Sequence, residues 1–199
     1  MDKIVELLCK YQYLFPTKIT NLKGIIGHLG MMKITLKPNT KPVKQRPYYL
    51  NPKYMEKVRV ELDKILAVGI IKPVEEFDWV IPMVVHEKKH KGEIRICVDL
   101  QKLNDVCVHD PFPTPFTDEV LENVGEQEAY SFTDGFSRYH QIKITPEDRS
   151  KTTFVIEWGY FQYTVMPFGL NNASAILLRI VVVAFKEYIH KFLEVYLDD

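Results

Sequence analysis

The sequence predicts an α+β fold, with an antiparallel sheet that carries helices on one face. Of the 199 residues, 46% are apolar and 26% are charged, so the chain can bury a substantial core. Short stretches with the alternating pattern of strands are interleaved with longer stretches that have the apolar spacing of helices. Strands interleaved with helices in this way are typical of the α+β class.

The first 50 residues are expected to form an approach segment rather than a domain. A short helix is expected around residues 4–13. Prolines then interrupt the chain at positions 38, 42 and 47, which favours turns and extended backbone.

A helix is predicted to follow. Asn51 is a good N-cap, Pro52 suits the first helical position, and Gly69 suits the end. One face of this helix is apolar and consists of Met55, Val58, Leu62, Ile65 and Leu66.

Three extended segments come next, at residues 70–73, 80–85 and 94–98. The last two are predicted to pair as a hairpin. Its turn, residues 88–92, carries lysines.

From residue 111 onward helices and strands are expected to alternate. Thr117 can cap a helix that ends near Gly125. A half-buried strand is then predicted over residues 130–134. A turn at 137–139, an extended segment at 141–144 and a helix start at 145–148 are expected next. Residues 153–157 and 160–166 are predicted to form a hairpin around Gly159. The last elements are a helix from Asn172 or Ser174 to about His190 and a strand at 192–197.

Three aspartates form the strongest candidate site. Asp198 and Asp199 follow one apolar strand and Asp134 ends another, so all three converge if the two strands are neighbours in a sheet. Adjacent carboxylates repel each other unless a cation lies between them. A two-metal site for phosphoryl transfer needs such oxygen ligands around two divalent ions about 4 Å apart. An isolated Asp-Asp pair is more often a charged turn after a strand.

Several longer motifs surround these aspartates. They read KQRPYYL at 44–50, RICVDLQKLN at 95–104, SFTDGFSRYHQIKI at 131–144, VMPFGLNNA at 165–173 and YLDD at 196–199. From about Leu7 to the last residue, the chain resembles the reverse transcriptase domain of a gypsy-type LTR retrotransposon Pol polyprotein. Several independent motifs in the family's order are far more specific than one short motif.

The resemblance implies the fingers and partial palm of a right-hand polymerase. Residues 1–50 would be the approach segment, 51–110 part of the fingers and 111–199 part of the palm, with fingers residues interleaved near 145–165. The thumb would be absent, because nothing follows the YLDD motif. The chain is therefore expected to be a truncated fragment with little or no activity alone.

The resemblance also assigns the metal ligands. Asp134, Asp198 and Asp199 would be the catalytic carboxylates and would bind two Mg²⁺ ions, or Mn²⁺ in their place. The backbone carbonyl of Gly135 would be a further ligand. One ion would activate the primer 3′-hydroxyl, and the other would bind the triphosphate and stabilise the leaving pyrophosphate.

Six residues match nucleotide-binding positions of the family. Lys88, Lys89 and Arg95 resemble its triphosphate clamp, although the lysines could simply be a solvated hairpin tip. Tyr139 matches the steric gate that excludes a ribose 2′-hydroxyl, and its alternative is a core tyrosine. Phe168 and Gly169 match the loop that lines the nucleotide pocket, where glycine permits a close backbone approach.

The chain departs from the family after VMPFGLNNA. Residues 174–179 read SAILLR where the family usually has Pro-Ala-Thr-Phe-Gln-Arg, so Leu178 replaces a polar glutamine. The helix is expected to be fit for packing but weakened for nucleic-acid contact. Arg138 occupies a position where a small residue is common.

The implied function is template-directed transfer of deoxynucleotides to a primer 3′-end. The expected partners are an RNA or DNA template with its primer, and deoxynucleoside triphosphates. The main alternative is a non-catalytic relic or a nucleic-acid-binding remnant that uses basic fingers. A telomerase-like or group II intron enzyme is a weaker alternative, which VMPFGLNNA argues against.

Charge and composition limit the other classes. The net charge is zero, but residues 33–102 carry 15 basic and 9 acidic side chains, and residues 103–199 carry 7 and 15. A basic half suits phosphates and an acidic half suits divalent cations.

The longest apolar stretch, residues 173–185, is too short to span a membrane. Three cysteines fit neither a disulfide framework nor a zinc site. An intracellular protein is expected, either cytoplasmic and particle-associated or nuclear, and its oligomeric state is left open.

Overall fold

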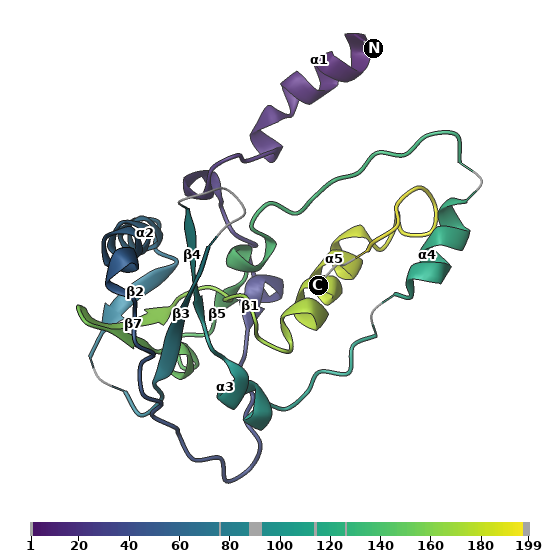
Figure 1. The fold of residues 1–199 in the computed structure, drawn as a ribbon. Coiled ribbons are helices and arrows are strands. Elements are labelled where there is room, and N and C mark those ends of the chain that lie inside the picture. Colours follow the sequence, from purple (N-terminus) through teal and green to yellow (C-terminus); the bar gives the residue numbers. More distant parts are fainter. Residues whose placement is uncertain (1, 76, 88–92, 114, 126, 197–199) are drawn as a thin grey trace.

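A computed structural model describes residues 2–75, 77–87, 93–113, 115–125 and 127–196. Its centre is a five-stranded mixed sheet (Figure 1). In spatial order the strands are β2 (Ile71–Val74), β7 (Gly159–Tyr163), β6 (Phe154–Ile156), β3 (Ile81–Glu87) and β4 (Ile94–Val98). The α+β class is confirmed, although the sheet is mixed rather than antiparallel because β3 and β6 run parallel.

The sheet joins distant parts of the chain. The hairpin of β3 and β4 was predicted and is confirmed, with Met83 opposite Val98. The hairpin of β6 and β7 is also confirmed, and Gly159 has the positive φ of 135° that its turn requires. The predicted second strand of that hairpin ends at Tyr163 rather than at residue 166.

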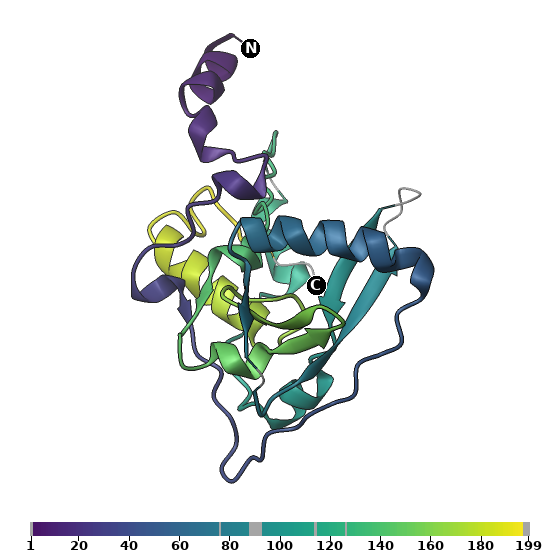
Figure 2. The same cartoon turned by 90° about the vertical axis from the view of Figure 1, so that its left-hand side faces the viewer.

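Helix α2 (Met55–Ala67) contacts both β2 and β4, so it crosses one face of the sheet (Figure 2). The Asn51 side chain accepts a hydrogen bond from the Lys53 amide, and the helix begins with a 3₁₀ turn, η4 (Pro52–Tyr54). At its other end Gly69 has a φ of 74°. The apolar face predicted for this helix is confirmed, because Val58 and Leu62 are buried in the core.

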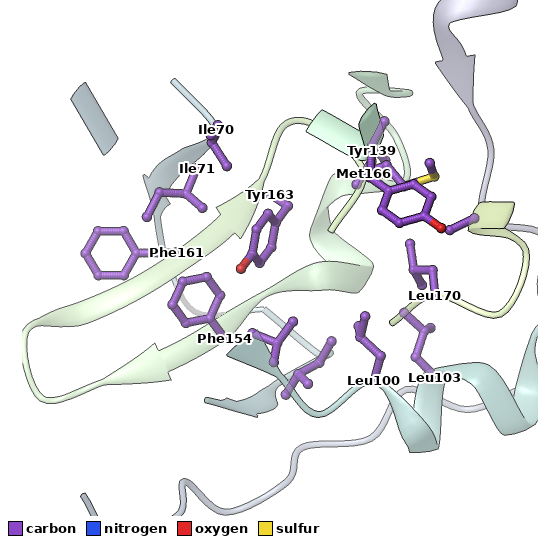
Figure 3. Packing of buried hydrophobic residues seen from close by; sticks show 14 of the residues in the cluster. Ile70, Ile71, Leu100, Leu103, Tyr139, Phe154, Phe161, Tyr163, Met166 and Leu170 are labelled. Carbon is purple, nitrogen blue, oxygen red and sulfur yellow. The ribbon is translucent and has the colours of Figure 1, made fainter. Parts of the chain in front are cut away.

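The core packs against the sheet and also includes residues from the segments 139–144 and 166–170 (Figure 3). The Phe154 ring is stacked on Phe161, with the ring centroids 5.9 Å apart, and lies 5.7 Å from Tyr163. Further along, Tyr139 lies beside Met166 and Leu170. The core therefore extends from the sheet to the segment that carries Tyr139.

The remaining elements surround this core. Helix α1 projects away from the rest of the molecule (Figures 1 and 2). The bounds are α1 (Asp2–Lys10), η1 (Gln12–Leu14), η2 (Ile19–Asn21), η3 (His28–Gly30), β1 (Met31–Met32), α3 (Gln101–Val106), α4 (Thr117–Val124), η5 (Arg138–Gln141), β5 (Lys143–Ile144), η6 (Arg149–Thr152) and α5 (Ala173–Phe185).

A buried carboxylate attaches the N-terminal segment to this body. Asp148 accepts hydrogen bonds from the Ile34 amide at 2.9 Å and the Thr145 hydroxyl at 2.7 Å. Lys151 donates to the same carboxylate and also to the Ile34 carbonyl, at 2.7 Å. Burial alone would raise the pKa of Asp148, but the hydrogen bonds from Lys151, Thr145 and Ile34 outweigh it and lower the pKa.

Two predicted strands are wrong where the structure describes them. Residues 130–134 form no strand, and residues 127–136 are all exposed. Residues 192–196 also form no strand, because the amides of Phe192 and Leu193 donate locally to the Tyr188 carbonyl. A strand needs a neighbouring strand to complete its hydrogen bonds. Among the described residues, 130–134 take part in no strand pairing, and 192–196 have only an isolated bridge between Leu193 and Ile189.

Three helix boundaries differ from expectation. Helix α5 ends at Phe185, five residues before His190. Thr117 is the first residue of α4 rather than its cap, and Phe116 occupies the N-cap position. The helix start predicted at residues 145–148 leads into η6, which is a short 3₁₀ helix. In the part of the chain that the structure describes, no helix is both long and apolar enough to cross a membrane.

Candidate functional site

Three side chains from two separate segments surround the Phe168 ring. Tyr139 and His140 of η5 approach it edge-on, with ring centroids 5.1 and 5.4 Å away. The guanidinium carbon of Arg95, on β4, lies 5.5 Å from the ring centroid in a cation–π arrangement. We call Arg95, Tyr139, His140 and Phe168 the Phe168 cluster. Since Phe168 is 41% exposed, the cluster is open to solvent on one side.

Asn104 of α3 holds the loop that carries Phe168 through two hydrogen bonds. The Asn104 side chain donates to the Gly169 carbonyl at 2.7 Å and accepts from the Asn171 amide at 3.1 Å. Gly169 has a φ of 93°, a conformation that favours glycine. Both ends of the turn are therefore fixed by one amide side chain, which the sequence reasoning did not single out.

Tyr139 is almost fully buried and belongs to the core. Its hydroxyl lies 3.3 Å from the Ser174 hydroxyl at the start of α5. The Arg138 guanidinium lies 5.3 Å from its ring centroid. Tyr139 is thus a core residue that also forms one wall of the Phe168 cluster.

His140 was not predicted to belong to the site. Burial, and secondarily the positive charge of Arg95, lowers its pKa to about 4. Its Nδ1 lies 2.9 Å from the Ser137 hydroxyl. His140 is therefore neutral at physiological pH and offers no charge to the cluster.

Residues 86–199 match the family model described as reverse transcriptase (RNA-dependent DNA polymerase). The chain belongs to the reverse transcriptase family. The resemblance found in the sequence is thereby confirmed, and the match includes the whole Phe168 cluster.

Curated relatives support the same assignment. The chain is 32% identical to the retrovirus-related Pol polyprotein from transposon gypsy of Drosophila melanogaster, over 81% of this chain and 16% of the relative. It is 33% identical to the polyprotein from transposon opus of the same species, over 84% of this chain and 17% of the relative. The chain thus spans about a sixth of the length of these Pol polyproteins.

Solved structures share the fold. The foamy viral protease–reverse transcriptase in complex with an RNA/DNA hybrid superposes with a TM-score of 0.77 at 20% identity, over 99% of this chain and 26% of that chain. The native prototype foamy virus enzyme gives a TM-score of 0.76 at 21% identity, with the same coverage.

The carboxylate site predicted for this chain lies only partly within the described residues. Asp134 is exposed, and the Gly135 carbonyl beside it accepts a hydrogen bond from the Arg138 amide at 3.1 Å. Asp198 and Asp199 lie outside the described residues, as do Lys88 and Lys89. Within the described ranges, no three His, Cys, Asp or Glu side chains lie close enough to hold a metal.

The altered helix after VMPFGLNNA serves packing. Leu178 is 2% exposed and lies in the core. In the next residue, Arg179, one terminal nitrogen donates to both carboxylate oxygens of Asp110, at 2.7 and 2.8 Å, and the guanidinium lies over the Phe112 ring. The hydrogen bonds from Arg179 lower the pKa of Asp110. Helix α5 is therefore fastened to the segment that precedes α4.

Proposed function

We propose that this chain forms the nucleotide-binding part of an RNA-directed DNA polymerase that adds deoxynucleotides to a primer 3′-end. The observation that carries this proposal is the convergence of Arg95, Tyr139 and Phe168 beside Gly169. These residues come from three separate segments and match the family's nucleotide-binding positions.

Each side chain has a distinct part in the proposal. The Arg95 guanidinium can donate paired hydrogen bonds to phosphate oxygens. The exposed Phe168 ring can contact the sugar or base. The Tyr139 ring is fixed by the core and would leave no room for a ribose 2′-hydroxyl, so deoxynucleotides would be selected.

The residues available for metal binding suit magnesium by their chemistry. Asp134, Asp198 and Asp199 with the Gly135 carbonyl are all hard oxygen donors, which Mg²⁺ prefers. Bound Mg²⁺ would stabilise the negative charge that develops on the attacking and leaving oxygens. Asp134 lies only five residues before Tyr139, so the proposed metal and nucleotide sites adjoin in the chain.

We also propose that the chain binds a template–primer duplex. One similar foamy viral structure is a complex with an RNA/DNA hybrid. Residues 33–102 of this chain carry 15 basic and 9 acidic side chains, which suits a phosphate backbone. The template would choose the base, and the protein would contact the backbone.

Primer extension on an RNA template tests the proposal. Because the chain spans about a sixth of its polyprotein relatives, the assay uses the chain joined to the downstream reverse transcriptase residues of the gypsy polyprotein. Asp134→Asn should abolish extension, whereas Asp118→Asn, an exposed aspartate on α4, should not. Extension at an unchanged rate by Asp134→Asn would refute the assigned chemistry.

A second candidate function is nucleic-acid binding without chemistry. The exposed position of Asp134 and the core packing of Leu178 favour it. Under this alternative a folded chimera would bind an RNA–DNA hybrid in a salt-dependent manner and extend no primer. Asp134→Asn would leave that affinity unchanged.

A further inference from the structure

We propose that the chain has a second, separate binding site for a phosphate-bearing ligand, in a pocket that shares His140 with the Phe168 cluster. We call it the Lys143 pocket and define it by Lys23, His140, Lys143 and Arg149. Its volume is about 260 Å³. The proposal does not depend on polymerase activity.

The charge of this pocket points to an anionic ligand. Lys23, Lys143 and Arg149 all line it, and its described lining includes no aspartate or glutamate. No ion pair joins any of the three cations to a carboxylate of the described residues. Three uncompensated cations around one concavity produce a positive potential that attracts an anion.

The geometry of the cations favours phosphate. The Arg149 Nε donates to the Ile144 carbonyl at 3.1 Å, which holds the guanidinium in place. A guanidinium can also give paired hydrogen bonds to two phosphate oxygens. Lys23 and Lys143 are exposed and would add mobile charges from two different segments.

The walls of the pocket are fixed by the backbone. The segment that carries Lys23 is held by the Ile25 amide, which donates to the Gln141 carbonyl at 2.9 Å. The end of α2 is held by the Thr164 hydroxyl, which donates to the Gly69 carbonyl. A Cβ added at Gly69 would meet no atom within 4 Å, so the pocket is open at this position.

The size of the pocket limits the ligand. Pockets for drug-sized ligands usually enclose about 300–1,000 Å³, so this one suits a small phosphate ester, pyrophosphate, or a single phosphate of a longer molecule. Apolar residues such as Val68 and Ile70 also line it, which would suit an organic group attached to the phosphate. A base-paired duplex would not enter.

Shared walls place this ligand next to the proposed nucleotide site. His140 lines the Lys143 pocket and also contacts the Phe168 ring. Gln141, the next residue, lines the pocket as well. A bound phosphate would therefore restrain η5, the element that presents Tyr139.

Binding is measured on the full chain in EDTA, because chelation removes metal-dependent nucleotide binding. The probes are inorganic phosphate, pyrophosphate and a deoxynucleoside monophosphate, each titrated by calorimetry and ³¹P NMR. We expect saturable binding at one site, weakened by added salt. Lys143→Gln and Lys23→Gln should each weaken binding roughly tenfold. Lys57→Gln, which removes a charge from the exposed face of α2, should have no effect.

Arg95→Gln separates the two sites. Loss of binding in Arg95→Gln, with normal binding in Lys143→Gln, would place the ligand at the Phe168 cluster and overturn the proposal. Absence of saturable binding for all probes would also overturn it. Arg149→Lys keeps the charge but loses the paired hydrogen bonds of the guanidinium, so it should weaken phosphate binding in a chain that still folds.

The source of the phosphate is tested with a short single-stranded oligonucleotide that carries a 5′-phosphate. Binding of the mononucleotide and pyrophosphate with equal lysine dependence supports a free small ligand. Binding that is lysine-dependent and needs the oligonucleotide supports the end of a nucleic-acid strand. Oligonucleotide binding that ignores Lys23 and Lys143 contradicts the site.

Discussion

His140 is a histidine whose surroundings keep it uncharged. Burial and the nearby Arg95 lower its pKa to about 4, well below the ordinary value of 6.5. Such a group binds protons more readily in the unfolded chain than in the folded one. Acid therefore favours unfolding wherever only the unfolded form takes up the proton.

The stability of the protein should therefore fall as the pH drops from about 6.5 to about 4. Above pH 6.5 both states hold a neutral imidazole, so the contribution of His140 is constant there. The loss across the window is at most about 3 kcal/mol. The free energy of unfolding, measured with urea at several pH values, should have a smaller slope against pH in His140→Gln than in the wild type across this window. His28→Gln, which replaces an exposed histidine, is the control, and an equal slope in wild type and His140→Gln would contradict the assignment.

Asn104 is expected to position the Phe168 loop rather than to touch the nucleotide. In Asn104→Ala the Gly169 carbonyl and the Asn171 amide lose their partner, at a cost of about 1 kcal/mol because water can reach them. In the chimera, KM for deoxynucleotides should rise several-fold while kcat changes less. Asn123→Ala on the exposed helix α4 is the matched control. Unchanged KM in Asn104→Ala would show that the loop does not need this support.

At the scale of elements, α5 shows how a packing helix excludes polar groups. Leu178→Gln restores the family's usual residue but places an amide in the core. We expect it to destabilise the fold by about 2–4 kcal/mol, because a buried leucine side chain is replaced by an amide without hydrogen-bond partners. Val183→Gln, at an exposed position of the same helix, should cost far less. Thermal unfolding of both variants measures the difference, and equal losses would contradict the burial of Leu178.

The contact between η6 and the N-terminal segment should behave as one unit. Asp148→Asn weakens the hydrogen bonds to Ile34 and Lys151, and we expect a loss of about 2–4 kcal/mol. Lys151→Met should cost less in the Asp148→Asn background than in the wild type, because the two groups share their interaction. Additive losses in this double-mutant cycle would show that the two side chains act independently.

Since the pKa of Asp148 is lowered from its ordinary 3.8, its stabilisation should disappear only below about pH 4, beneath the window of His140.

For the whole molecule, local patterns predicted local elements well. The α2 helix and both hairpins follow from capping, turn residues and apolar spacing, all of which lie within a few residues of one another. Arg95 and Phe168 were each assigned to the nucleotide site by matching family positions, but their contact was not predicted, since nothing in the residue spacing connects β4 to the loop before α5. Asn104 and His140 were missed because their partners are set by the tertiary fold.

The failed strand at residues 130–134 has a different cause. Its alternating side chains have the correct pattern, yet the segment stays exposed because a strand also requires a hydrogen-bonding neighbour. A sequence pattern describes which face a strand would bury but does not supply the partner.

The order of strands in the sheet has a consequence for synthesis of the chain. Ile71 pairs with Tyr163, and Ile81 pairs with Phe154, so the middle of the sheet is built by the later hairpin. Such non-local pairings raise the contact order and slow folding. Nascent chains released before residue 154 should be cleaved by protease across β2 and β3, whereas chains extending past residue 163 should be protected. On the ribosome, β2 must therefore wait without its sheet neighbour while more than eighty further residues are translated, which makes this interval the period when a chaperone would matter most.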